Sequence, residues 1–265
     1  MTGPSANTTD VPSGLDFGIG IDVGGTWIKG AIINMGSGTP VGGVRRLRTP
    51  ACGTVDEVAN TLDQLIDELE SESPGHSAPA VGVAIPSIVQ HGVARSAANM
   101  DAGWIGLDVQ AYLRERLGRP VCVVNDADAA GMAEAHYGVG KDKRGVVLVL
   151  TLGTGIGSAL IVDGKLIPNF ELGHLEIDGH KAESRASAVA RENAGLDWIE
   201  YADRLQLYLS HVEFLFSPDL IIIGGGISEC SNEYLPRLSL RTPVIPASLE
   251  NSAGVVGAAL QAAAA

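Results

Sequence analysis

Two short glycine-rich segments of the chain carry side chains that could bind phosphate. The first contains Asp22, Gly24, Gly25, Thr26 and Lys29. Glycines let backbone N–H groups converge on an anion, the threonine adds a hydroxyl, the lysine adds positive charge, and the aspartate can hold a hydrated Mg²⁺. An ordinary tight hairpin would look the same in isolation, so the rest of the chain has to decide between the two interpretations.

The second segment repeats this pattern about half a chain later. It contains Thr151, Gly153, Thr154 and Gly155, between the apolar stretches 145–152 and 156–162. Aligning Gly153 with Gly24 gives a strand, a Gly/Thr turn and a second strand in both places. A repeat of this kind indicates a duplicated domain, and two similar lobes would present both turns to one cleft.

A third cluster consists of Gly224, Gly225 and Gly226, directly after the apolar stretch 220–223. A strand that ends in glycines permits close approach of a flat or phosphorylated ligand, although a flexible strand-to-helix turn is the alternative. Two familiar phosphate signatures do not fit. Thr26 stands where a P-loop requires lysine, and the second segment leads into a strand where a dinucleotide fingerprint opens a helix.

Carboxylates that could act as a base follow a buried strand. The apolar stretch 121–124 ends in Asn125, Asp126 and Asp128. Transfer of a phosphoryl group to a hydroxyl needs a base to accept the proton, and we choose Asp126 for that role. Asp128 is the competing carboxylate, with a capping role as its alternative. The amide of Asn125 can both donate and accept hydrogen bonds, so it could contact hydroxyl groups of a ligand.

Composition limits the class of protein. The 265 residues are 45% apolar, which allows one large core or two lobes, and the net charge of −13 argues against broad binding of nucleic acid or anionic membranes. A polyanionic ligand would need a local basic patch, such as Arg45, Arg46 and Arg48 or the segment 141–144. Three widely spaced cysteines and no long apolar run favour a cytoplasmic protein without a membrane span.

The predicted elements place these residues at strand ends. A third strand over 42–49 follows the first hairpin, a capping box at Thr54 and Glu57 opens a helix, and a buried strand over 80–85 is closed by Pro86 and Ser87. A helix over 108–117 precedes the strand at 121–124. A helical stretch over 187–215, broken near 193–195, follows the second hairpin, and small residues from 251 onward predict a closing helix.

The combined motifs resemble those of a known family. Asp22 to Thr26, Asn125 to Asp128, Leu152 to Gly157, Glu171 to His174 and Gly224 to Ser228 look like the motif set of the ROK sugar kinases, within the actin, hexokinase and Hsp70 superfamily. Closer matches at 151–158, 169–174 and 241–244 resemble the bacterial polyphosphate/ATP-dependent glucokinases and glucomannokinases. The resemblance covers about Phe17 to Gly257.

The resemblance implies an α/β fold of two duplicated βββαβα lobes of ribonuclease H type, with the active site between them. We expect a leader at 1–16 without order, one lobe at 17–124, a second at 125–252, and a helix at 253–265 packed on the first lobe. The implied phosphate or nucleotide site consists of the three glycine segments, with Asp22 on Mg²⁺. The implied sugar site comprises Ser87, Asn99, Asn125, Asp126, Glu171, His174 and Glu183.

The implied activity is transfer of the terminal phosphoryl group of polyphosphate or ATP to the 6-hydroxyl of glucose, with mannose as a further acceptor. ROK enzymes generally carry a cysteine-rich zinc site after the histidine motif, whereas 177–187 holds no cysteine, so no zinc site is expected. The alternatives are an ATP-only ROK hexokinase, a non-catalytic sugar-sensing protein and a nucleotide-binding oxidoreductase. Monomer and homodimer, and the preferred donor and sugar, stay open.

Overall fold

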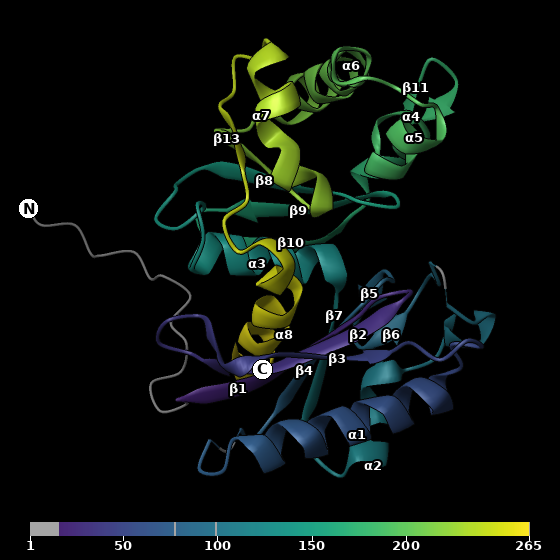
Figure 1. Ribbon diagram of the computed structural model, residues 1–265, viewed down its shortest axis with the longest axis vertical. Helices are drawn as coiled ribbons and strands as arrows, with labels where there is room; N and C mark the ends of the chain where they lie inside the picture. Colours follow the sequence, from purple (N-terminus) through teal and green to yellow (C-terminus); the bar gives the residue numbers. More distant parts are fainter. Residues whose placement is uncertain (1–15, 77, 99, 265) are drawn as a thin grey trace, which may run out of the picture.

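Two sheets with the same strand order organise the protein. The computed structural model describes residues 16–76, 78–98 and 100–264. The first sheet has the order β3-β2-β1-β4-β7 and the second has the order β10-β9-β8-β13-β14. In each sheet three antiparallel strands are followed by two parallel ones. The duplicated α/β fold predicted from the half-chain repeat is therefore confirmed (Figure 1).

Each half of the chain builds one sheet and the helices around it. The first half consists of β1 (Phe17–Val23), β2 (Trp27–Asn34), β3 (Thr39–Arg48), α1 (Val55–Glu72), β4 (Val81–Ile85), β5 (Val89–Gln90), β6 (Val93–Ala94), α2 (Val109–Leu117) and β7 (Val121–Asn125). The second half consists of α3 (Asp126–His136), β8 (Val146–Leu152), β9 (Ile156–Val162), β10 (Lys165–Phe170), β11 (Glu176–Ile177), β12 (His180–Lys181), α4 (Glu183–Ala186), α5 (Ala188–Asn193), α6 (Trp198–Phe216), β13 (Leu220–Gly224), α7 (Ser231–Tyr234), β14 (Val244–Pro246) and α8 (Ala253–Ala264).

Local sequence explains the helix that covers the outer face of the first sheet. Thr54 caps α1 and exchanges hydrogen bonds with Glu57, as the capping box predicts. The apolar positions of α1 recur every three or four residues and are buried, and this face packs on β2 and β3. The core strands β4 and β7 are buried along their whole length, which is typical of parallel strands covered on both faces.

The helices α3 and α8 form a layer between the two sheets (Figure 1). The helix α3 contacts β8 and β9 of the second sheet, and α8, although it also belongs to the second half, contacts β1, β4 and β7 of the first sheet. The close approach requires small residues, since a Cβ added at Gly257 would lie 1.7 Å from the carbonyl oxygen of Ala129. The two sheets are thus joined through the pair α3 and α8.

The expected elements and the observed ones differ mainly at α3, which the sequence patterns did not predict. Most of its residues are small, and they are buried on more than one side, so it has no polar stripe by which a helical period could be seen. The break predicted near 193–195 is present, because α5 ends at Asn193 and α6 begins at Trp198. Among the described residues, none of the helices is both long and apolar enough to cross a membrane.

Candidate functional site

A cleft of about 490 Å³ lies between the two halves of the molecule. Its walls come from both glycine turns, from the carboxyl ends of β4 and β7, and from the segment after β10. The predicted site residues that line it are Gly24, Gly25, Ser87, Asn125, Asp126, Thr151, Gly153, Thr154, Gly155, Glu171, His174, Glu183 and Gly225. Residues up to two hundred positions apart in the chain thus meet in one cavity.

Each glycine turn is closed by a backbone hydrogen bond from its first glycine, to the third residue further on in the first turn and to the second residue further on in the second turn. In the first, the N–H of Gly24 donates to the carbonyl of Trp27 at 3.0 Å, and in the second, the N–H of Gly153 donates to that of Gly155 at 3.0 Å. Within the described part of the chain, the next two N–H groups of each turn, at 25–26 and 154–155, have no acceptor. Free N–H groups on a tight turn form a concave site for an anion, so each turn can receive phosphate oxygens.

A second cavity of about 170 Å³ opens on the other side of Asp126. It is lined by Asp22, Lys29 and Gly224 from the predicted phosphate set, and it shares Asp126, Ala127, Thr151 and Gly225 with the cleft. Asp22 and Lys29 are directly paired across β1 and β2. Asp126 therefore stands where the two cavities meet.

The surroundings of Asp126 raise the pKa of its carboxyl group to about 7, from an ordinary value of 3.8. Burial is the largest cause, and the negative charges of Asp22 and Glu171 add to it. The N–H of Ala127 donates to the carboxylate and opposes the shift. A carboxylate with a pKa near neutrality is a stronger proton acceptor than an ordinary aspartate, which suits a general base.

The neighbours of Asp126 on α3 have structural partners. Asn125 caps α3, because its side-chain oxygen accepts from the N–H groups of Ala127 and Asp128, while its amide donates to the carbonyl of Ser87. Asp128 lines neither cavity, and its Oδ2 accepts from the N–H of Asn169 at 2.9 Å. One amide hydrogen of Asn125 is left for a ligand, and Asp126 is the carboxylate that faces the cleft.

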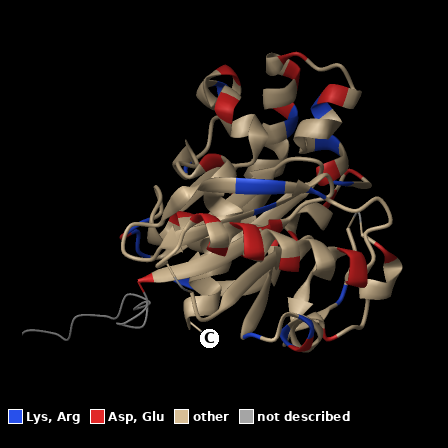
Figure 2. Cartoon of the chain, turned by 60° about the horizontal axis from the view of Figure 1, so that its bottom comes forward, with Lys and Arg blue, Asp and Glu red and all other residues tan. Residues whose placement is uncertain are grey.

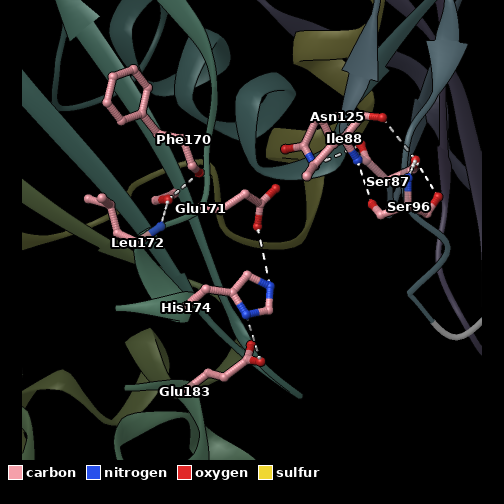
Figure 3. A network of polar contacts seen from close by, with 10 residues as sticks. Ser87, Ile88, Ser96, Asn125, Phe170, Glu171, Leu172, His174 and Glu183 are labelled. Carbon is pink, nitrogen blue, oxygen red and sulfur yellow. Dashed lines mark hydrogen bonds and ion pairs between the residues drawn. The ribbon is translucent and has the colours of Figure 1, made fainter. Parts of the chain in front are cut away.

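A histidine between two carboxylates occupies the other wall of the cleft (Figure 3). Nε2 of His174 lies 4.0 Å from Oε2 of Glu171, and its Nδ1 lies 3.7 Å from Oε1 of Glu183. Burial, the largest cause, and the charge of Glu183 raise the pKa of Glu171, while His174 lowers it. Gly155 lies close to this pair, because a Cβ at that position would lie 2.6 Å from Oε2 of Glu183, so a larger residue would displace this carboxylate.

The β11–β12 hairpin brings Glu183 to this histidine. The hairpin spans 176–181, and its end is fixed by a hydrogen bond from the N–H of Ala182 to the carbonyl of Leu175 at 2.8 Å. The next residue, Glu183, begins α4. Among the described residues, no group of three or more His, Cys, Asp or Glu side chains has an arrangement that could hold a metal ion.

Two polar residues of the cleft region did not stand out in the sequence. Ser96 lines the cleft beside Ser87: the Oγ of Ser87 donates to the carbonyl of Ser96 at 2.6 Å (Figure 3). Asn169 bridges the two halves, since its Oδ1 accepts from the N–H of Val89 at 2.9 Å and its Nδ2 donates to the carbonyl of Val89 at 2.8 Å. Neither has a sequence signal of its own, although Asn169 lies inside the segment 169–174 that carries the family resemblance.

Two of the predicted site residues that the structure describes, Thr26 and Gly226, are not among those that line the two cavities. Thr26 is exposed next to Gly25, and its carbonyl accepts from the N–H of Thr49. Gly226 begins the 3₁₀ turn that follows β13. Asn99 lies outside the residues that the structure describes.

Similar proteins were found by sequence and by structure. The model of the ROK family matches residues 18–194. Polyphosphate glucokinase of Mycobacterium tuberculosis (strain H37Rv) is 43% identical over 98% of this chain and 96% of its own length. The crystal structure of inorganic polyphosphate/ATP-glucomannokinase from Arthrobacter sp. strain KM is 58% identical, with a TM-score of 0.87 over 92% of this chain and 97% of that one.

A more distant structure has the same fold. A ROK family glucokinase from Streptomyces griseus, in complex with glucose and AMPPNP, has a TM-score of 0.79 at 24% identity and covers 93% of this chain and 99% of its own. At this identity the likeness concerns the fold alone. The two-lobed arrangement is therefore common to relatives of very different sequence.

Proposed function

The chain belongs to the ROK family, and from this premise we propose that it is a sugar kinase. It transfers the terminal phosphoryl group of inorganic polyphosphate or ATP to the 6-hydroxyl of glucose, with mannose as a second acceptor. The donors and sugars are those in the names of the Mycobacterium polyphosphate glucokinase and the Arthrobacter polyphosphate/ATP-glucomannokinase. The match extends over nearly the whole length of both relatives, which supports a shared activity.

One observation carries the proposal: Asp126 lines both the cleft and the smaller cavity behind it. The cleft side offers Glu171 and His174, groups that hydrogen-bond hydroxyls, and the other side offers Asp22 and Lys29, groups that suit a phosphate and its counterion. A base between a hydroxyl site and a phosphate site is what transfer from phosphate to alcohol requires.

Asp126 accepts the proton of the attacking hydroxyl in this mechanism. Its deprotonated form predominates above about pH 7, the value to which its pKa is raised. The fixed position of Asn125 as the cap of α3 holds the first turn of that helix, and with it Asp126, at the floor of the cleft. The base is thus oriented before the sugar arrives, which reduces the entropic cost of the reaction.

The two glycine turns hold the transferred phosphoryl group through their free N–H groups, one turn from each half. Charge developing on the phosphoryl oxygens is stabilised by these dipoles and by Lys29. Mg²⁺ is bound by few protein carboxylates and by phosphate oxygens, so a site with Asp22 and no larger acidic cluster among the described residues fits it. When bound, Mg²⁺ would neutralise charge on the donor phosphates.

The sugar ring is held by Glu171, His174 and Glu183 on one wall of the cleft and by the remaining amide hydrogen of Asn125 on the other.

We also propose a cytoplasmic location, where the free thiols of Cys52, Cys122 and Cys230 stay reduced.

The experiment is phosphorylation of glucose by the purified protein with nucleotide-free polyphosphate, and separately with ATP. We expect glucose 6-phosphate from both donors, and we expect Asp126→Asn to lower kcat by about a thousandfold or more while glucose still binds in a calorimetric titration. Asp128→Asn is the matched control, because it removes a carboxylate of the same helix turn that lines neither cavity. An Asp126→Asn protein with substantial turnover would refute the base assignment.

A further inference from the structure

Three arginines on the edge strand β3 point to opposite faces of the first sheet. Arg45 lies on the face of α1, where its side chain pairs with Glu72. Arg46 and Arg48 lie with Trp27, their guanidinium carbons 5.0 Å and 4.0 Å from the centre of its ring. Figure 2 shows a long blue stretch of Lys and Arg on a strand near the middle of the view.

Cross-strand pairing connects Arg46 and Arg48 to Lys29 and Asp22, and Lys29, Arg46 and Arg48 thus form a row of cations that begins beside Asp22. Asp22 is paired with Lys29, and Lys29 is paired with Arg46, so these three residues share one face of the sheet. Trp27 and Arg48 form the next pair on that face. Neighbouring strands are about 4.8 Å apart, so Lys29 is about 5 Å and Arg46 about 10 Å from the strand of Asp22.

The row begins inside the smaller cavity and ends on the surface. Lys29 and Asp22 line the cavity behind Asp126, whereas Arg46 and Arg48 are exposed. The strand β3 is also tied to the first glycine turn, since the Oγ1 of Thr49 donates to the carbonyl of Gly24 at 2.6 Å. A linear ligand that starts at the turn can therefore follow the row outward without leaving the protein.

The chemistry of the row suits phosphate. Arginine binds phosphate oxygens through paired N–H groups, and stacking on an indole ring fixes the plane of the guanidinium in advance. The protein as a whole has a net charge of −13, so a polyanion is attracted to few places on it. A row of three cations that leads away from the phosphate turn is such a place.

We propose that Lys29, Arg46 and Arg48, with Trp27 as their support, bind the part of a polyphosphate chain that extends beyond the transferred phosphoryl group. This inference rests on the proposed function. At about 10 Å from the strand of Asp22, the two arginines contact phosphates well beyond the transferred one and contribute little to a donor with three phosphates. The row gives the enzyme a preference for long chains over ATP and tripolyphosphate.

The test compares Arg46→Gln, Arg48→Gln and the double variant with Arg45→Gln. All remove one or two exposed arginines from the same strand, but Arg45 lies on the opposite face. The double variant is expected to lose about tenfold or more in kcat/KM for long-chain polyphosphate, mainly through KM, with ATP and tripolyphosphate unchanged within about twofold. Arg45→Gln is expected to keep all three values.

A second readout is the salt dependence of long-chain binding, measured by calorimetric titration without sugar. Each lost contact should reduce the slope of log Kd against log salt concentration by about one. Equal affinity of wild type and double variant for long chains, or an equal loss with ATP, would overturn the proposal that this row binds polyphosphate. Failure of the proposed function would look different: wild type would form no glucose 6-phosphate from polyphosphate, whether or not the arginines bind it.

Discussion

Asp126 and Asp128 lie two residues apart on α3. Their surroundings give them different roles, which the sequence alone does not distinguish. Burial raises the pKa of both Asp126 and Asp128 to about 7. Asp126 faces the cleft and has Asp22 and Glu171 as charged neighbours, whereas Asp128 accepts from the N–H of Asn169 and is 1% exposed. The difference lies in access to a ligand, and a sequence motif contains no information on which way each carboxylate points.

At the scale of the single residue, the raised pKa of Asp126 predicts the pH dependence of turnover. As pH falls below about 7 the carboxylate becomes protonated and can no longer accept a proton. We expect kcat/KM for glucose, measured at low donor concentration, to fall about tenfold per pH unit on the acid side. Asp22→Asn removes a negative neighbour and is expected to move the midpoint to lower pH. A profile that stays flat from pH 6 to pH 8 would contradict this prediction.

Protein stability offers a readout of the same pKa that does not depend on activity. A carboxyl group with a raised folded-state pKa favours folding when protonated, and this contribution is lost as pH rises through about 7. Asp126→Asn should therefore increase the free energy of unfolding by about 2 to 3 kcal/mol more at pH 8 than at pH 5, because pH 5 lies between the unfolded pKa of 3.8 and the folded pKa of about 7 and one pKa unit corresponds to about 1.4 kcal/mol. Denaturant titrations at the two pH values measure the difference.

The predicted site residues share one property: most lie in or beside turns whose composition is itself informative. Glycine turns and the histidine motif place Gly25, Gly155 and His174 in the cleft, and sequence alone could find them. Asn125 was expected to bind sugar, and its oxygen is instead occupied as the cap of α3. Asn169 was not singled out, because its value lies in contacts with Val89, eighty residues earlier in the chain, and no local pattern reports such a contact.

At the scale of the element, the end of strand β10 connects the two halves through hydrogen bonds of Asn169. Its ladder with β9 is irregular between Ile167 and Phe170, and Asn169 has a φ of 63° there. This backbone turns the side chain of Asn169 toward β5, where it forms two hydrogen bonds with Val89. Asp128 secures the arrangement from α3 through the N–H of Asn169.

Asn169→Ala is expected to remove both hydrogen bonds across the cleft. Each is worth about 1 kcal/mol, so the free energy of unfolding should fall by about 1 to 3 kcal/mol. Because β10 leads directly into Glu171 and His174, we also expect KM for glucose to rise several-fold. Steady-state kinetics and denaturant unfolding measure the two effects.

Asn34→Ala is the matched control for the loss of the Asn169 hydrogen bonds. Asn34 also serves two backbone groups, accepting from the N–H of Gly36 at 3.0 Å and of Ser37 at 3.2 Å, but all of them belong to the turn between β2 and β3. It should lower stability without changing KM for glucose. The same change in KM for both variants would show that loss of stability, and not the position of β10, affects sugar binding.

At the scale of the whole molecule, the two sheets exchange the helices that follow them in the chain. The helix α3 follows the last strand of the first sheet and packs on the second, while α8 follows the second sheet and packs on the first. The repeat of the glycine turns was visible in the sequence and predicts two similar lobes. The exchange was harder to see, because α3 and α8 are built from small residues that are buried between the sheets and have no amphipathic pattern.

The contact between α3 and α8 therefore determines where Asp126 lies relative to both sheets. A Cβ at Gly257 would lie 1.7 Å from the carbonyl oxygen of Ala129, one turn into the helix that Asp126 begins. The position of the Cβ is fixed by the backbone of α8, and the oxygen belongs to the backbone of α3. Gly257→Ala must therefore move α3 away from α8. We expect a loss of about 2 kcal/mol or more in the free energy of unfolding and a fall in kcat of at least about tenfold, measured at a temperature where the variant is fully folded.

Gly36→Ala provides the comparison for the helix contact. Gly36 is exposed in a turn of the first half, and its nearest neighbour for a Cβ is the side chain of Asn34 at 3.3 Å, so this variant should retain wild-type kcat. Ala129 and Asp126 lie three residues apart on α3, and a shift of the helix at one position must therefore reach the other. A Gly257→Ala protein that is destabilised but turns over at the wild-type rate would mean that the position of Asp126 is set within the first half alone, by β7 and the cap at Asn125, and not by the packing of the two halves.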